Sequence, residues 1–467
     1  MKGLHAIGIS VTTASQTLVE PVDLTLLPGQ PLTLLGETGS GKSLLAQAIM
    51  GILPDDLQAS GTLIINDRCF TLPQDVALLR TLWGHTLASL PQEPWLSLDP
   101  TMSVLQQVAE GYRFVRGQTK ADSENAASSD LQQLGLAQSA SRYPWQLSGG
   151  MAQRAAFAAA RAGGAQILLA DEPTKGLDVA RRDEVAALLR REVAEGGTLL
   201  TITHDIALAR QLGGEVIVMH KGKVIEQGRA EQVMHSPQQS YTRKLLAADP
   251  AAWPARQQTF IASKPVVSAE GIQLQRRGKM LGVPENFTLH AGEVVGLYGA
   301  SGSGKSSFGD VLLGLLTPQR GRITRHAAVD TLKYQKIYQD PSALFPPTRT
   351  LGQSLNDLLR RHRIASTRRD ALMEQLALAP DLLKRRPDAL SGGELQRFSL
   401  LRVMLLEPVF LFADEPTSRL DPRVQQQTIQ LITSLASEQQ CAVLLVSHDR
   451  DLLEKGTHRV IAMETRN

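Results

Sequence analysis

The sequence has little cysteine and no long apolar run. Cys69 and Cys441 are its only cysteines, one in each half of 467 residues. This count excludes a disulfide framework and a cysteine-held metal cluster, and it fits a reducing compartment. The apolar runs, such as 442–446, have the length of a strand, whereas a membrane-spanning helix needs about 20 residues. We therefore expect any path through a bilayer to be formed by other subunits. No long apolar region follows the N-terminal residues, so no signal peptide is expected.

An excess of one charge sign is also missing. The 49 Lys and Arg residues nearly balance the 46 Asp and Glu residues, which leaves a net charge of +3. Proteins that bind nucleic acid usually carry a clustered basic excess, so we expect no nucleic-acid partner. Aromatic residues make up 4% of the chain, while 42% of it is apolar and 20% charged. That composition is typical of a globular protein, and this length predicts two domains.

The chain repeats itself. Four segments recur, and their copies lie 263, 243, 243 and 244 residues apart in chain order. A near-constant offset after the first segment predicts a duplicated domain, shorter in its second copy between the first two segments. Paired prolines in the segment between the copies indicate a linker. The predicted domains are 1–248 and 266–467, with 249–265 as the linker. The recurring segments are 36–43 with 299–306, 147–150 with 390–393, 170–174 with 413–417, and 203–205 with 447–449.

The first recurring segment reads Gly-x-x-x-x-Gly-Lys-Ser and follows a short apolar run. Glycines in this pattern turn backbone N–H groups toward phosphates, and the lysine reaches the terminal phosphates. The serine hydroxyl is placed to bind Mg²⁺. Two such segments in strand–loop–helix context make ordinary glycine-rich turns a poor alternative. The predicted nucleotide-binding residues are Gly36, Thr38, Gly39, Gly41, Lys42, Ser43, Gly299, Ser301, Gly302, Gly304, Lys305 and Ser306.

Two adjacent carboxylates end an apolar run in each half: Asp171-Glu172 and Asp414-Glu415. Adjacent acids at the end of a buried strand are costly for stability. The chemistry that needs them places the aspartate on the metal and the glutamate on the attacking water as general base. The alternative is an acid pair that caps a helix.

His204 and His448 each end a later strand-like run. Taken alone, each is better interpreted as a satisfied histidine of the core. Together with the phosphate loop and the acid pair, the favoured interpretation is a contact to the terminal phosphate that orients the water and the glutamate. The predicted catalytic residues are Glu172, His204, Glu415 and His448.

The segments 147–154 and 390–397, Leu-Ser-Gly-Gly-x-x-Gln-Arg, resemble the signature motif of ATP-binding-cassette (ABC) proteins. The resemblance covers both halves and implies an α/β fold of two P-loop ATPase domains. Each would have a RecA-like parallel-sheet core, an antiparallel β subdomain and an inserted helical subdomain. It also implies a head-to-tail sandwich within the chain. Ser391 and Gly393 would cap ATP on Lys42, while Ser148 and Gly150 would cap ATP on Lys305.

Gln92 and Gln339 resemble the glutamine loop of this family, which senses Mg²⁺ and contacts membrane subunits. Their surroundings and the segment 236–246 are similar to importers of peptides and nickel, here with two usually separate subunits fused. The resemblance departs where an aromatic residue normally stacks on adenine, because Thr12, Thr13, Arg276 and Arg277 occupy those positions. The predicted metal-contacting residues are Ser43, Gln92, Asp171, Ser306, Gln339 and Asp414.

The hypothesis that follows is an ATPase with ATP and Mg²⁺ as cofactors and two hydrolytic sites. It would drive import of a peptide, nickel or a metal chelate from the cytoplasmic face of a bacterial inner membrane. Two permease subunits and an extracytoplasmic binding protein would be its partners. The alternatives are a twin-cassette ATPase acting on ribosomes or nucleic acid, and an exporter ATPase. The sequence specifies neither the cargo nor the order in which the sites fire.

Overall fold

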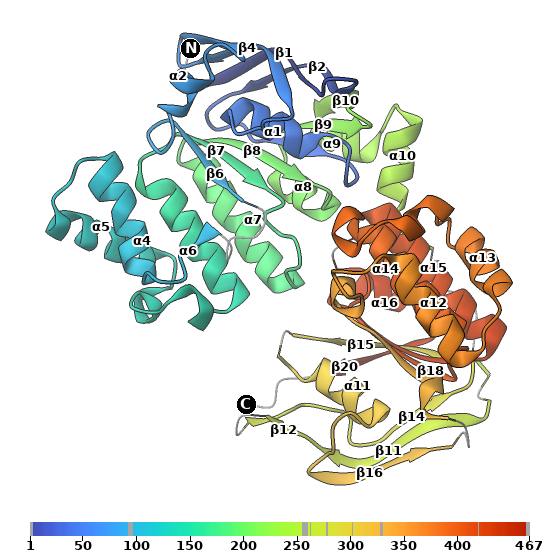
Figure 1. The fold of residues 1–467 in the computed structure, drawn as a ribbon. Coiled ribbons are helices and arrows are strands. Elements are labelled where there is room, and N and C mark those ends of the chain that lie inside the picture. Colours follow the sequence, from blue (N-terminus) through green and yellow to red (C-terminus); the bar gives the residue numbers. More distant parts are fainter. Residues whose placement is uncertain are drawn as a thin grey trace. The chain divides into compact units, whose positions relative to one another are not determined.

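The computed structural model describes residues 3–91, 97–254, 260–261, 263–276, 279–300, 302–326, 330–418 and 420–463. The chain divides into two compact units, Met1–Leu246 and Ala247–Asn467. Each contains a parallel sheet, an antiparallel sheet and a group of helices (Figure 1). The predicted α/β class with this subdivision is confirmed. Within the described residues no helix is long and apolar enough to cross a membrane.

In the first unit, the order of the core sheet is β10-β9-β3-β8-β7-β6. All neighbours are parallel except β9 and β10. A second, antiparallel sheet has the order β2-β1-β4-β5. The strands are β1 Leu4–Thr12, β2 Thr17–Leu26, β3 Leu32–Leu35, β4 Gln58–Ile65, β5 Arg68–Leu72, β6 Leu87–Leu90, β7 Ile167–Asp171, β8 Thr198–Thr203, β9 Glu215–His220 and β10 Lys223–Arg229.

The helices of this unit include α1, which lies between the two sheets (Figure 1). One hydrophobic core joins the antiparallel sheet, α1 and one face of the parallel sheet, and another joins the opposite face to the helical subdomain. The helices are α1 Lys42–Met50, α2 Val76–Arg80, α4 Val104–Glu110, α5 Lys120–Gln133, α6 Gly149–Ala162, α7 Val179–Ala194, α8 Ile206–Leu212, α9 Ala230–His235 and α10 Ser240–Ala247, with a π-helical turn at Gly111–Val115.

In the second unit, the core sheet has the order β17-β18-β19-β15-β20, all parallel, beside an antiparallel sheet β14-β11-β16. The predicted buried strands before each phosphate loop and acid pair are confirmed. The strands are β11 Pro265–Gln273, β12 Gln275–Arg276, β13 Lys279–Met280, β14 Phe287–His290, β15 Val294–Gly299, β16 Arg320–Arg325, β17 Tyr334–Ile337, β18 Phe410–Asp414, β19 Ala442–Val446 and β20 Arg459–Met463.

Its helices α12 to α16 gather on the face of the parallel sheet opposite α11 and the antiparallel strands (Figure 1). A separate hydrophobic core fills each side. The helices are α11 Lys305–Leu313, α12 Leu351–His362, α13 Ser366–Gln375, α14 Gly392–Leu405, α15 Pro422–Gln439 and α16 Arg450–Gly456.

The segment between the phosphate loop and the glutamine loop is shorter in the second half for a structural reason. After α1 this segment of the first unit contains β4, β5, α2 and β6, whereas after α11 the described residues of the second contain β16, a 3₁₀ turn at Thr331–Lys333 and β17. Cys69 lies exposed in β5, whereas Cys441 is buried directly before β19. Burial raises the pKa of the Cys441 thiol, because the thiolate loses its hydration.

The start of the segment expected to be a linker packs against the second unit. A short 3₁₀ helix at Pro250–Ala252 lies beside α16, and the Lys455 ammonium donates to the carbonyls of Pro250 and Ala251 at 2.9 and 2.6 Å. The indole of Trp253 donates to the carbonyl of Ala248 at 2.9 Å. These contacts satisfy carbonyls in a segment that proline keeps out of longer helices.

Candidate functional site

The two phosphate loops have the same geometry. Helix α1 begins at Lys42 after Gly41, whose φ is 98°, and α11 begins at Lys305 after Gly304, whose φ is 106°. In neither helix does a side chain cap the first turn. The N–H groups of that turn and the dipole of the helix suit an anion. Ser301 lies outside the described residues.

The lysine side chain of each loop folds back onto the backbone carbonyls of the same loop. Lys42 Nζ donates to the carbonyls of Gly36 and Glu37, both at 2.8 Å, and Lys305 Nζ donates to those of Gly299 and Ala300 at 2.7 and 2.9 Å. Both lysines are buried. Each loop therefore concentrates positive charge at the N-terminus of its helix, which fits a chain of phosphates.

Only glycine fits the first position of each loop. A Cβ at Gly36 would lie 2.3 Å from the carbonyl oxygen of Met219, and one at Gly299 would lie 2.7 Å from that of Met463. Gly39 and Gly302 have φ of 79° and 82°, where other residues are strained. Thr38 lies next to Gly39 in the first loop. The pattern read from the sequence thus has a steric basis in both halves.

The loop serine and the strand aspartate meet in each unit. Ser43 Oγ donates to Asp171 Oδ1 at 3.2 Å, and Ser306 Oγ donates to Asp414 Oδ1 at 3.0 Å. Burial raises the pKa of both aspartates, and the serine hydrogen bonds oppose that shift only in part. A hydroxyl and a carboxylate are ligands that Mg²⁺ accepts together with water and phosphate oxygens. The residues fit that ion, although the described residues contain no group of three or more His, Cys, Asp or Glu that could hold a metal.

The neighbouring glutamates face the histidines. His204 Nδ1 lies 2.8 Å from Glu172 Oε1, and His448 Nε2 lies 2.5 Å from Glu415 Oε1. In the first unit Thr203 Oγ1 also donates to Glu172 Oε2 at 3.2 Å. Both glutamates have φ of 48°, a left-handed conformation that costs on the order of 1 kcal/mol and is typical of functional positions.

Each charge in the first pair stabilises the other. Burial opposes ionisation of Glu172, but attraction to His204 and the hydrogen bonds from it outweigh burial and hold the pKa of Glu172 below its usual value. Burial also opposes protonation of His204, but Glu172 outweighs it and raises the pKa of the imidazole. The carboxylate is therefore ionised, as a general base must be.

Gln339, which the sequence predicts to contact the metal, lies beside Glu415. Gln339 Nε2 donates to Glu415 Oε2 at 2.6 Å. In this arrangement Gln339 orients Glu415 through Nε2, and its Oε1 is the atom that could bind a cation. Gln92, its counterpart, lies outside the described residues.

The signature serines begin helices. Ser148 Oγ accepts from the N–H of Met151 at 3.4 Å at the start of α6, and Ser391 Oγ accepts from that of Glu394 at 3.3 Å at the start of α14. Gly150 and Gly393 lie in the first turns of these helices. Each signature segment is thus an N-terminus of a helix, a second place suited to phosphate.

An aliphatic side chain packs against the last glycine of each phosphate loop. A Cβ at Gly41 would lie 3.0 Å from Cγ2 of Val19, and one at Gly304 would lie 3.0 Å from Cβ of Leu281. Of the residues predicted near adenine, Thr13 stabilises a turn by accepting from the N–H of Gln16 at 3.1 Å. Arg277 lies outside the described residues.

Sequence reasoning missed Lys336 and Asp310. Lys336 Nζ lies 2.7 Å from Asp310 Oδ1 and 3.6 Å from Asp414 Oδ2, beside the serine–aspartate pair. The sequence does contain an indication of this site. Lys336 lies in the strand that leads to Gln339, and the first half has Ser89 at the position of this lysine. A position-by-position comparison of the halves could have found it.

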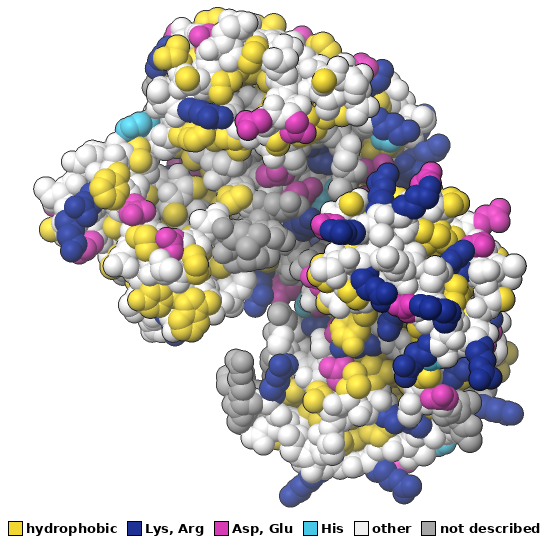
Figure 2. All heavy atoms as spheres, viewed as in Figure 1, with side chains coloured by type: hydrophobic (Ala, Val, Ile, Leu, Met, Phe, Trp, Pro, Cys, Tyr) yellow, Lys and Arg dark blue, Asp and Glu magenta, His cyan; other side chains and the backbone are white. Residues whose placement is uncertain are grey.

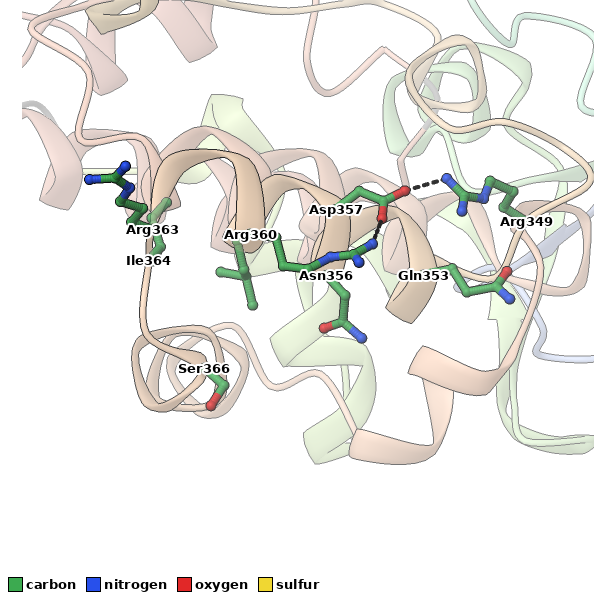
Figure 3. A pocket seen from close by; sticks show the side chains of 9 residues that line it. Arg349, Gln353, Asn356, Asp357, Arg360, Arg363, Ile364 and Ser366 are labelled. Atoms are coloured by element: carbon green, nitrogen blue, oxygen red, sulfur yellow. Dashed lines mark hydrogen bonds and ion pairs between the residues drawn. The ribbon is translucent and has the colours of Figure 1, made fainter.

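A cavity of about 650 Å³ opens elsewhere in the second unit, on α12 and the start of α13, and contains no predicted residue (Figure 3). Asp357 pairs with both Arg349 and Arg360 there, and these ion pairs neutralise part of the basic charge that lines the cavity. Lys and Arg side chains gather over these helices (Figure 2). Residues 346–389 carry nine basic and five acidic residues, whereas 100–146 carry four of each. The two helical subdomains therefore differ in charge.

The chain matches the ABC transporter family over residues 19–175 and 284–418. It is 34% identical to the peptidoglycan transport ATP-binding protein YejF of Agrobacterium fabrum, covering 96% of this chain and 88% of that one. It is 33% identical to the glutathione import ATP-binding protein GsiA of Escherichia coli K12, covering 95% of this chain and 81% of that one.

Among solved structures, the RNase-L Inhibitor aligns with a TM-score of 0.67 at 21% identity, over 98% of this chain and 88% of that one. At that identity the likeness concerns the fold. The duplicated fold, the paired phosphate loops and the family match agree, and the chain belongs to the ATP-binding ATPases of the ABC transporter family.

Proposed function

We propose that this protein hydrolyses ATP to drive import of a small solute through separate membrane permease subunits. One observation carries the proposal: relatives matched over 95% or more of this chain are named as transport or import ATP-binding proteins. Their names mention peptidoglycan and glutathione. Both contain peptide bonds, so a peptide-like cargo fits better than nickel or a metal chelate.

The chemistry is assigned to the residues that meet in each half. Bound ATP supplies the phosphoanhydride bond, and Mg²⁺ supplies positive charge to its phosphates. Lys42 and Lys305 hold the terminal phosphates, and Ser43 with Asp171, and Ser306 with Asp414, hold the metal. Glu172 and Glu415 take a proton from the attacking water at a carboxylate oxygen. His204 and His448 orient those glutamates.

Two ATP sandwiches within one chain complete the proposal. Ser391 and Gly393 would close on ATP at Lys42, and Ser148 and Gly150 on ATP at Lys305. The support is that each signature segment begins a helix with its backbone N–H groups at the free end. We assign the ATPase domains to 1–248 and 266–467 and the connection to 249–265.

The partners that follow are two permease subunits and an extracytoplasmic binding protein, with this protein peripheral on the cytoplasmic face of the inner membrane. The rival is a twin-cassette ATPase acting on ribosomes. A likeness in fold to the RNase-L Inhibitor and to an archaeal ribosome recycling factor keeps that rival worth testing. At 21% identity neither specifies a function for this chain.

A pull-down of the full chain from native membranes in mild detergent separates the two. Glu172→Gln with Glu415→Gln, which we expect to hold ATP without hydrolysis, is the bait, and Lys42→Ala with Lys305→Ala is the matched nucleotide-free control. Recovery of two polytopic permeases, identified by mass spectrometry, supports import. Recovery of ribosomal proteins without a permease overturns it and leaves the ATPase.

A further inference from the structure

One difference between the two nucleotide sites concerns charge. In the second, the Lys336 ammonium lies between two carboxylates, 2.7 Å from Asp310 Oδ1 and 3.6 Å from Asp414 Oδ2. The side chains of Lys336 and Asp414 are each 11% exposed and that of Asp310 is 23% exposed. Water therefore screens these charges only in part. The ammonium lies beside one oxygen of Asp414 while Ser306 donates to the other.

The residues around Lys336 fit this position together. Its ammonium lies 5.0 Å from the ring centres of Tyr338 and Phe412, a distance at which aromatic faces attract a cation. Lys336 on β17 pairs directly with Phe412 on β18. A Cβ at Gly309 would lie 2.2 Å from the Phe412 ring, so only glycine leaves room for that ring.

The first half carries other residues at the position of Lys336 and at four positions around it. Ser89 on β6 pairs with Leu169 on β7 where Lys336 pairs with Phe412. Gln47, five residues after Lys42, stands where Asp310 follows Lys305, and its Oε1 is buried without a hydrogen-bond partner among the described residues. Ala46 and Pro91 stand in place of Gly309 and Tyr338. Five positions thus differ in a mutually consistent way, which indicates a built feature of the second half.

We propose that Lys336 is a positioning residue that makes the second nucleotide site bind Mg²⁺ more weakly than the first. The proposal rests on the assignment of the metal to Ser306 and Asp414. The Lys336 ammonium competes with the metal for the Asp414 carboxylate and repels the metal. Asp310 weakens both effects, because its carboxylate attracts the ammonium from the side opposite Asp414. The two sites then differ in metal requirement although they share the serine, aspartate, glutamate and histidine.

The test uses the full chain carrying Lys42→Ala, which restricts high-affinity nucleotide binding to the second site, and Mn²⁺ as a spectroscopic substitute for Mg²⁺. Electron paramagnetic resonance counts bound Mn²⁺ in the presence of ATP. Lys336→Met leaves two carboxylates facing the metal, so affinity should rise about tenfold. Asp310→Asn leaves the ammonium to Asp414 alone, so affinity should fall by a similar factor.

The opposite signs separate a direct charge effect from a structural one. If the ion pair only supports the fold, both variants weaken Mn²⁺ binding or both leave it unchanged, and either result overturns the inference. Lys333→Met is the matched control, because it removes another lysine ion pair of the same unit, with Glu407 at 3.4 Å. Ser306→Ala tests the assignment of the metal to Ser306 and Asp414, on which the proposal rests. Unchanged Mn²⁺ affinity in this variant overturns that assignment.

Discussion

The two halves of this chain hold the same reacting groups in different surroundings. Both place a serine on an aspartate and a histidine on a glutamate, within a few tenths of an ångström of the same distances. Around them Thr203 donates to the glutamate of the first half, whereas in the second half Gln339 donates to the glutamate and Lys336 lies beside the aspartate. Gln92, the counterpart of Gln339, lies outside the described residues. The two halves share the serine, aspartate, glutamate and histidine and differ in the side chains around them.

The largest expected effect comes from replacing the glutamate that both halves share. Glu172→Gln with Glu415→Gln should reduce ATP turnover by about 10²–10⁴-fold, because the amide cannot accept the proton of the attacking water. Phosphate release by the purified full chain is the measurement. Glu195→Gln and Glu438→Gln, which alter exposed acids of the two halves, should leave turnover unchanged. Near-normal release in the double variant would refute the base assignment, and the two single variants show what each site contributes.

The lysines test whether the two loops bind nucleotide equally. Lys42→Ala and Lys305→Ala should each weaken ATP binding at their own site by about 10–100-fold, through the loss of a charge-assisted hydrogen bond to phosphate. Titration with a fluorescent ATP analogue resolves the two affinities. Lys223→Ala, which removes a surface pair with Glu20, is the control. Unchanged affinity in either loop variant contradicts the role of that lysine.

A smaller effect concerns stability at low pH, which should differ between the two halves. Glu293 is buried, and Arg459 and His290 donate to it at 2.7 and 3.0 Å. Burial opposes its ionisation, but these partners outweigh burial and lower its pKa below the usual 4.5. Its stabilising effect is therefore complete above pH 4.5 and is lost as the pH falls through the lowered folded-state value. The first half has Gln30 at this position.

Glu293→Gln should accordingly destabilise the second half by about 2 kcal/mol at pH 7. The difference from the unaltered protein should shrink in acid as Glu293 itself becomes protonated. Urea unfolding of the full chain at pH 7 and at pH 3 measures both. Glu438→Gln, an exposed acid of the same unit, is the control. An equal destabilisation at both pH values would show that the charge of Glu293 does not matter.

The smallest effect concerns the glutamine of each signature helix. Gln153 Nε2 donates to the carbonyl of Pro173 at 2.6 Å, whereas Gln396 Nε2 is buried with no hydrogen-bond partner in the described part of the chain. Gln153→Met should cost about 1 kcal/mol, and Gln396→Met should be neutral or stabilising. Thermal unfolding of the full chain compares them. Equal losses would mean that both amides are satisfied in solution.

Much of the fold could be predicted from sequence, because its determinants are local. Apolar strand-length runs ending at a glycine or an acid pair located β3, β15, β7 and β18. The glycines identified both phosphate loops. The position of Gln339 on Glu415 could not be predicted, since it depends on a contact between residues 76 apart. Nor could the pairing of Lys336 with Asp310, which requires knowing that β17 lies beside β18 and faces α11.

The two thiols of this chain offer an experimental advantage. Cys69 is exposed on the antiparallel sheet of the first half, while Cys441 is buried beside β19 and has a raised pKa. Thiolates, not thiols, react with maleimides. The unaltered protein should therefore accept one dye per molecule, at a known place in one half. Single-molecule fluorescence could then follow that half without any engineered cysteine.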